Sequence, residues 1–219
     1  SGTIRIRGVS GLHSAEMEVP ADRIAAGTYL LAGAATRGEV ALEGAPVAEI
    51  RSLLELYGKM GGQYEVKGGT LFTDSRGIGN RPVQVATGCY PGFPTDLRSP
   101  LAAVCATIEG ISRIRETIFE DRYQAALELR KMGADISVRD GELRICGGRL
   151  RGAALRAGDL RGGAALILAG LAASGVTQIE NSCYVERGYE QIEKDLRQLG
   201  GAVRYEKTSR LPVYADTEE

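Results

Sequence analysis

Apolar and small residues fill three segments of the chain, and an Asp opens each of them. The segments cover residues 22–38, 96–110 and 159–175. Within the last one, residues 164–173 have the sequence AALILAGLAA, which leaves no polar side. A helix that is apolar all round is buried, and Asp is a favoured N-cap residue. The pattern therefore predicts three buried helices, each beginning at its Asp.

Three further segments have one apolar stripe and one charged face, and they cover residues 46–60, 121–132 and 188–199. Helices of this kind lie at the surface with the stripe toward the core. Each segment is followed by glycine, the residue type that most often ends a helix in the left-handed conformation. These glycines are Gly61, Gly133 and Gly200. They recur at intervals of about 70 residues, which indicates an internal repeat.

Short strand patterns follow both sets of helices. After the buried helices they cover residues 39–44, 111–117 and 176–181, and after the outer helices residues 63–68, 135–140 and 202–207. The pairs Gly68-Gly69 and Asp140-Gly141 are typical two-residue hairpin turns, so strands are also expected at 70–74 and 142–146. The third copy shows no clear final strand, and the polar residues after Tyr205 predict a mobile tail.

These elements predict an α/β domain of three βαβαββ units, covering residues 3–75, 82–148 and 149–206, with 207–219 as a tail. The buried helices are expected to pack in the centre about a pseudo-threefold axis, with the sheets and outer helices around them. If the buried helices are parallel, their N-termini face one side of the domain. That face would display three aspartates and three arginines, namely Asp22, Asp96, Asp159, Arg23, Arg98 and Arg161.

Composition narrows the class of protein. The 219 residues carry a net charge of -1, which argues against a nucleic-acid-binding surface. The sequence has no signal peptide and no apolar run of about 18 residues, so neither secretion nor a membrane span is expected. The four cysteines are widely spaced and there is one His, which cannot make a normal zinc site. We expect reduced structural thiols in a cytoplasmic protein.

Helix N-termini attract anions because their N–H groups are unpaired and carry partial positive charge. Each Asp has a simpler explanation as an N-cap, which we favour for Asp22. Asp96 differs because the stiff loop YPGFPT precedes it, and a fixed carboxylate beside cationic helix ends can act as a base. Arg161 lies in a glycine-rich first turn with room for a ligand. Arg122 and Arg187 would, on their own, be solvated charges.

Several strings occur in the order and spacing of a known family. They are PADRI at 20–24, FPTD at 93–96, FEDR at 119–122, DLR at 159–161 and RGYE at 187–190. Through them the chain resembles the enolpyruvyl transferases, above all the UDP-N-acetylglucosamine 1-carboxyvinyltransferases; the sister 3-phosphoshikimate enzymes look less similar. The resemblance implies an inverse α/β barrel fold, two such domains per enzyme, and an active site in the cleft between them. This chain resembles only the domain formed mostly by the C-terminal half.

The resemblance also implies roles for individual residues. Asp96 matches the base that deprotonates the sugar hydroxyl, Asp159 an acidic residue beside phosphoenolpyruvate, and Arg187 an arginine that binds phosphoenolpyruvate; we expect these three to be catalytic. Arg161 matches a second phosphoenolpyruvate-binding arginine. Positions around the UDP-sugar are matched by Thr95, Ile118, Phe119 and Arg122. The implied partners are UDP-N-acetylglucosamine, phosphoenolpyruvate and the missing domain, with no metal or organic cofactor.

Some parts of the family's site have no match in this sequence. They are an early Lys-Asn pair, a mobile loop with a reactive Cys, and further phosphate-binding arginines. Cys89 does not match the loop Cys and is expected to be structural. The family's N-terminal residues normally add a strand to this domain, so the third unit is expected to be incomplete. We therefore expect the chain alone to be inactive. The alternatives are a non-catalytic nucleotide-sugar-binding or interaction domain and a 3-phosphoshikimate 1-carboxyvinyltransferase.

Overall fold

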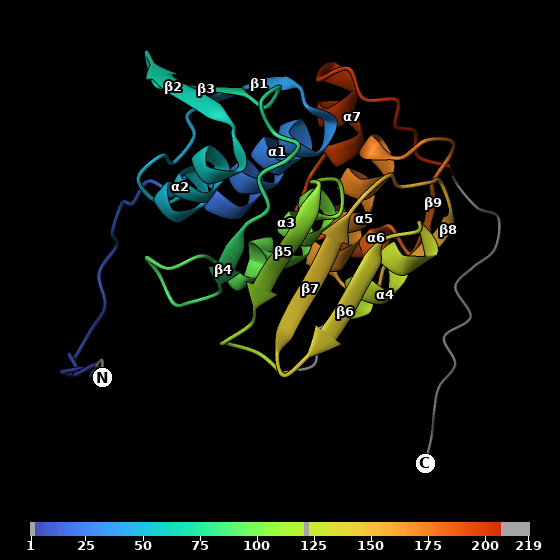
Figure 1. Cartoon of the computed structure of the whole chain (residues 1–219). Coiled ribbons are helices and arrows are strands. Elements are labelled where there is room, and N and C mark those ends of the chain that lie inside the picture. The colour runs from blue at the N-terminus through green and yellow to red at the C-terminus, as the bar shows by residue number, and fades with distance from the viewer. Residues whose placement is uncertain (1–2, 121–122, 207–219) are drawn as a thin grey trace.

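Three helices form the centre of the molecule in the computed structural model, which describes residues 3–120 and 123–206 (Figure 1). They are α1 (Arg23–Thr36), α3 (Arg98–Cys105) and α5 (Leu160–Ala172), and each contacts the other two. Small residues allow the close approach: a Cβ placed on Gly27 of α1 would lie 2.5 Å from Leu97 Cδ1 beside α3. The prediction of three buried central helices is confirmed.

The three central helices point the same way. At their N-terminal ends, Arg161 of α5 lies 3.4 Å from Asp96, just before α3. At their C-terminal ends, Arg37 after α1 donates a 2.8 Å hydrogen bond to the carbonyl oxygen of Thr107 after α3. Ala172 of α5 lines the same end of the bundle. The domain therefore has an N-terminal pole and a C-terminal pole, as the parallel arrangement predicts.

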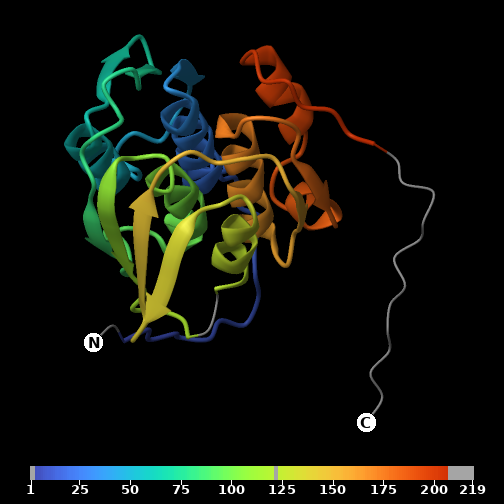
Figure 2. The same cartoon turned by 45° about the vertical axis from the view of Figure 1, so that its right-hand side comes forward.

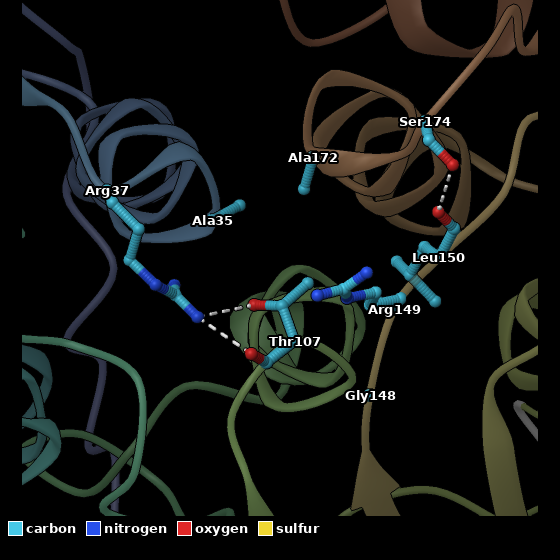
Figure 3. Close-up of a pocket in the computed structure, with 8 residues that line it drawn as sticks. All are labelled: Ala35, Arg37, Thr107, Gly148, Arg149, Leu150, Ala172 and Ser174. Carbon is cyan, nitrogen blue, oxygen red and sulfur yellow. Dashed lines mark hydrogen bonds between the residues drawn. The ribbon is translucent and has the colours of Figure 1, made fainter.

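The C-terminal pole contains a hollow of about 300 Å³ between the helix ends (Figure 3). Its lining residues are Ala35, Arg37, Thr107, Gly148, Arg149, Leu150, Ala172 and Ser174. The Arg37 guanidinium also donates to the carbonyl oxygen of Ala34 and, over 3.1 Å, to the Thr107 hydroxyl. The last carbonyls of a helix are unpaired and partially negative, so Arg37 fastens the ends of α1 and α3 together.

Three separate sheets surround the helices. Antiparallel strands in the order β1-β3-β2 form the first, from β1 (Glu39–Glu43), β2 (Gln63–Lys67) and β3 (Thr70–Asp74). The second has the order β4-β5-β7-β6, from β4 (Gln84–Ala86), β5 (Gly110–Arg115), β6 (Asp135–Arg139) and β7 (Glu142–Gly147), with only β4 and β5 parallel. The third pairs β8 (Ala154–Arg156) with β9 (Gln178–Glu180) in parallel. Both predicted hairpin turns are present between their strands.

The outer helices are α2 (Arg51–Met60), α4 (Gln124–Lys131) and α7 (Ile192–Gln198), and a short helix α6 (Cys183–Glu186) precedes the last. The glycines that follow them have left-handed φ values of 105°, 88° and 90°, as predicted for Gly61, Gly133 and Gly200. The predicted starts of α2 and α7 were too early because residues 46–50 and 187–191 form mainly turns, and the helices begin only after them. Residues 121–122, where the third start was placed, lie outside the described residues.

Two predicted strands are absent from the described residues. Residues 3–22, which should open the first unit, are exposed and without regular structure, and Figure 2 shows this blue segment running along the bottom of the molecule, away from β1. Residues 202–206 also form no strand. A strand needs a partner for its N–H and C=O groups, and neither segment pairs with a described strand. Within the described residues the sheets stay separate and do not close into the inverse α/β barrel that the resemblance implies. The predicted tail at 207–219 lies outside the described residues.

Candidate active site

The three aspartates at the helix starts have unequal surroundings. Asp22 Oδ1 accepts hydrogen bonds from the amides of Ile24 (2.7 Å) and Ala25 (3.2 Å), and Asp159 Oδ1 accepts one from the amide of Gly162 (2.7 Å). Both are N-caps, as favoured above for Asp22. Asp96 instead lies inside the 3-10 helix η1 (Thr95–Leu97), whose N-cap position has no side-chain capping bond. Its carboxylate is therefore not used as a cap.

Asp96 and Arg161 meet between two helix starts. Asp96 Oδ2 lies 3.4 Å from Arg161 Nη2, and their side chains are 41% and 22% exposed. Tyr189 holds the other side of the guanidinium, because Arg161 Nη1 donates to its hydroxyl over 3.2 Å and the ring centroid is 5.5 Å away. The Tyr189 hydroxyl also bonds the Thr28 hydroxyl over 2.8 Å. A carboxylate and a cation are thus held side by side and remain accessible to solvent.

Arg187 and Asp159 lie beside the same helix start. Arg187 is exposed directly after α6, and its side chain has no hydrogen bond or ion pair within residues 3–120 and 123–206. Its neighbour Gly188 packs on the first turn of α5, where an added Cβ would lie 2.8 Å from Leu160 Cδ2 and 3.4 Å from Arg161 Nη1. The structure therefore brings Asp96 and Arg161 into contact, with Asp159 as the N-cap of the same helix and the backbone next to Arg187 packed on its first turn.

Glu116 is a buried carboxylate at the end of β5 that the sequence analysis did not identify. Its side chain is 1% exposed. Burial by itself would raise its pKa, but hydrogen bonds from the Thr87 and Thr95 hydroxyls and from the amides of Ile118 and Phe119 together lower the pKa below its usual range. The sequence pattern could have indicated this burial. Side chains alternate between the two faces of a strand, and Glu116 continues the series of the buried Ser112 and Ile114.

The predicted UDP-sugar positions gather around this carboxylate. Thr95 Oγ1 donates to Glu116 Oε2 over 2.7 Å, and the amides of Ile118 and Phe119 donate to Oε1 over 2.8 and 3.3 Å. The side chains of Ile118 and Phe119 are 39% and 41% exposed, so the backbone is fixed while the apolar side chains face solvent. Arg122, the remaining predicted position, lies outside the described residues.

Arg98 was expected at the surface of the N-terminal pole, and this prediction was wrong. Its side chain is 4% exposed and forms an ion pair with Glu116, with Nη1 to Oε2 at 3.3 Å. Its guanidinium also lies over the ring of Tyr123, 5.0 Å from the centroid. Arg98 is the first residue of α3 and turns inward because the buried carboxylate of Glu116, directly after β5, needs a counter-charge.

Arg23 remains at the N-terminal pole, as expected. Its guanidinium lies over the ring of Tyr90, 5.3 Å from the centroid, and Tyr90 belongs to the loop before Asp96. The Nη1 atom is buried and has no hydrogen-bond partner in the described part of the chain. The pole thus combines cations, unpaired helix N–H groups and one uncapped carboxylate. Such an arrangement can bind an anionic ligand and accept a proton from a hydroxyl.

Residues 3–120 and 123–206 contain no group of three or more His, Cys, Asp or Glu side chains that could hold a metal ion. Their helices are all too short or too polar to cross a bilayer. The four cysteines are free thiols, with Cys105 buried and Cys89 exposed.

Comparison with known proteins gives matches over nearly the whole chain. The family model described as EPSP synthase (3-phosphoshikimate 1-carboxyvinyltransferase) matches residues 1–196. The UDP-N-acetylglucosamine 1-carboxyvinyltransferase of Deinococcus radiodurans is 41% identical over 203 residues, which are 93% of this chain and 48% of the relative. UDP-N-acetylglucosamine 1-carboxyvinyltransferase 1 of Clostridium acetobutylicum is 41% identical over 205 residues, 93% of this chain and 49% of the relative. The chain spans about half the length of these curated relatives.

Solved structures show the same fold. The enolpyruvyl transferase NikO from Streptomyces tendae superposes with a TM-score of 0.74 at 30% identity, covering 84% of this chain and 44% of that chain. EPSP synthase from Acinetobacter baumannii gives a TM-score of 0.66 at 21% identity, covering 87% and 45%, and supports the fold alone. These matches confirm the predicted resemblance and the predicted α/β fold.

Proposed function

Because the chain belongs to the EPSP synthase family, we propose that it is one domain of an enolpyruvyl transferase that acts on UDP-N-acetylglucosamine. The reaction would take place in the cytoplasm, in the synthesis of peptidoglycan precursors. The choice of this substrate over 3-phosphoshikimate is supported by the curated relatives, which are 41% identical and carry that name. The EPSP synthase structure is only 21% identical.

The proposed reaction joins the 3-hydroxyl oxygen of the sugar to C2 of phosphoenolpyruvate. Asp96 accepts the hydroxyl proton as the oxygen attacks C2, and C3 gains a proton. C3 then loses a proton as phosphate leaves from C2, which restores the carbon–carbon double bond of the enolpyruvyl group. Arg161 and Arg187 bind the carboxylate and phosphate groups, for which a guanidinium has matching paired donors. Asp159 fixes the first turn of α5 by its capping bond. Catalysis rests on positioning, proton transfer and charge stabilisation.

One observation carries this proposal. Among three equivalent helix starts, only Asp96 is free of a capping bond, and its carboxylate faces Arg161 across 3.4 Å. A capping Asp is occupied by backbone N–H groups, whereas the Asp96 carboxylate is 41% exposed and available to a substrate hydroxyl. The proposed base and the proposed anion-binding cation thus lie side by side at the pole where the helix N-termini converge.

We further propose that the chain forms one wall of a two-domain cleft. Its three units would be residues 3–75, 82–148 and 149–206, and a second domain would supply the remaining groups. The half-length coverage of the relatives supports this division. An isolated wall binds part of the substrate but lacks the opposite groups, so it is expected to be inactive alone.

Two measurements test the proposal. Phosphate release from both substrates should be absent with the isolated chain, and turnover at an enzyme-like rate would contradict the half-site. Titration followed by NMR should detect binding of UDP-N-acetylglucosamine and none of 3-phosphoshikimate. Asp96→Asn should weaken binding about tenfold, the effect of one lost hydrogen bond to a charged group.

The repeat supplies a matched control. Asp22→Asn makes the same chemical change at an equivalent helix start, and Asn is as good an N-cap as Asp. Its affinity for UDP-N-acetylglucosamine should stay within about twofold of the wild type. Equal losses in the two variants would remove Asp96 from the proposed role.

A further inference from the structure

We infer that Glu116 is a positioning residue of the site, holding the Asp96 turn and the backbone of residues 117–119 in one fixed arrangement. This inference rests on the proposed function, because Asp96 and Ile118 are its proposed base and sugar-contact position. Glu116 itself is not a catalytic residue, since a side chain that is 1% exposed does not touch a ligand in the cleft.

The two carboxylate oxygens of Glu116 serve different segments. Oε2 accepts from the Thr95 hydroxyl over 2.7 Å and faces Arg98 Nη1 at 3.3 Å, so it is tied to η1 and α3. Oε1 accepts from the amides of Thr117 (3.1 Å), Ile118 (2.8 Å) and Phe119 (3.3 Å). One rigid group therefore joins the turn that carries Asp96 to the segment that presents Ile118.

Thr87 extends the same network. Its hydroxyl donates to Glu116 Oε1 over 2.7 Å and accepts a 2.9 Å bond from the Thr117 amide. The Thr117 hydroxyl in turn donates to the Thr87 carbonyl over 2.7 Å. The loop that runs from Thr87 to Asp96 is thus held at both of its ends by contacts that involve one carboxylate.

The energetics favour a fixed arrangement. A buried carboxylate is costly unless its hydrogen-bonding capacity is satisfied. Glu116 accepts hydrogen bonds from two hydroxyls and three amides and forms an ion pair with the Arg98 guanidinium. Bonds to an ionised acceptor are stronger than neutral ones. Neutralising the group weakens several of them at once, so the two segments lose their common anchor together.

Glu128 provides a matched control for a purely stabilising carboxylate. Its side chain is 5% exposed, and it accepts from Lys131 Nζ over 2.7 Å and from the amide of Arg156 over 2.9 Å. These partners belong to α4 and β8, and none of them is among the hydrogen-bond partners of Glu116. Glu128→Gln removes a buried charge of the same kind without touching the proposed site.

The test compares Glu116→Gln and Glu128→Gln in the 219-residue chain. Amide hydrogen exchange, measured by NMR, should accelerate about tenfold at Ile118 in Glu116→Gln, since exchange reports the local opening free energy. The same amide should stay within about threefold of the wild type in Glu128→Gln. Thr87→Val keeps the side-chain shape but removes one hydrogen-bond donor to Glu116. It should accelerate exchange at Ile118 by a smaller factor, and it replaces Glu116→Gln in the test if that variant does not fold.

Affinity supplies the second readout. UDP-N-acetylglucosamine should bind about tenfold more weakly to Glu116→Gln and equally well to Glu128→Gln. Unchanged exchange at Ile118, or equal effects of the two glutamine variants, would overturn the inference. If the wild type fails to bind UDP-N-acetylglucosamine, the proposed function is wrong, and exchange at Ile118 still decides whether Glu116 holds the two segments.

Discussion

Replacing Tyr189 with Phe tests how the Arg161 guanidinium is held. The ring is 3% exposed and stays in place in the variant, so apolar burial is unchanged. Only the hydroxyl is lost, together with its bonds to the Thr28 hydroxyl (2.8 Å) and Arg161 Nη1 (3.2 Å). Thr28 keeps a 2.9 Å bond to the carbonyl of Ile24, which limits the damage to the loss of these two bonds.

The expected magnitude follows from those two bonds. A buried neutral hydrogen bond contributes about 1 kcal/mol, and the partly exposed guanidinium can recover part of its loss in water. We therefore expect Tyr189→Phe to lower the free energy of unfolding by about 1–2 kcal/mol. For a domain of this size, each kcal/mol corresponds to a fall of roughly 2–4 °C in the unfolding midpoint. Urea unfolding followed by circular dichroism measures the change.

Tyr64→Phe is the control for this prediction. Tyr64 lies on β2 and is 46% exposed, so removing its hydroxyl should change stability by less than about 0.5 kcal/mol. Equal free energies of unfolding in the two variants would show that the Tyr189 hydroxyl does not contribute to the fold. If the second domain is supplied, Tyr189→Phe should also weaken phosphoenolpyruvate binding, because Arg161 loses one of its two fixed neighbours.

Three further outcomes are expected. Gly163→Ala should destabilise the domain by about 1–3 kcal/mol through overpacking, because the added Cβ would lie 2.6 Å from a neighbouring side chain. Gly58→Ala should instead stabilise α2 by about 0.5–1 kcal/mol in the same urea assay, because its added Cβ would have nothing within 4 Å. Hydrogen bonds hold the pKa of Glu116 below the ordinary 4.5 despite burial. Its contribution to stability is therefore complete above that pH and is lost as the pH falls through the lower folded-state pKa. Glu116→Gln should lose less stability than the wild type over that range, and parallel curves of unfolding free energy against pH would contradict this. Burial raises the pKa of the Cys105 thiol to about 12, so a thiol reagent followed by mass spectrometry should label Cys89 in the native protein and Cys105 only after unfolding.

Local sequence was sufficient for the features that depend on neighbouring residues. The run at 164–173 is apolar on every side and forms the interior of α5, and the capping bonds of Asp22 and Asp159 need only the next three residues. The glycine after each outer helix and the two hairpin turns are likewise local, because each depends on a left-handed conformation that few residues adopt.

The sequence pattern did not predict the features that depend on residues far away in the chain. Arg98 turns inward because of Glu116, which is 18 residues away in sequence and directly follows β5. The segment at 202–206 has the composition of a strand, but a strand forms only where another strand offers its edge. Residues 3–22 likewise form no strand, because they pair with no described strand. Hydrophobic pattern identifies which residues are suited to an element, and the tertiary partner decides whether the element exists.

The unequal helix starts show how one copy of a repeat comes to present an uncapped carboxylate. In α1 and α5 the Asp has an extended backbone, and its side chain turns back to the first amides. In the second copy Pro94 takes the extended conformation, with φ of -71° and ψ of 133°, and η1 follows it. Asp96 is thereby moved from the cap position into the first turn, where its carboxylate meets Arg161 instead of the backbone. Because the Thr95 hydroxyl ties this turn to Glu116, the displacement is fixed by the fold, and a residue type that caps two helices has an uncapped carboxylate on the third.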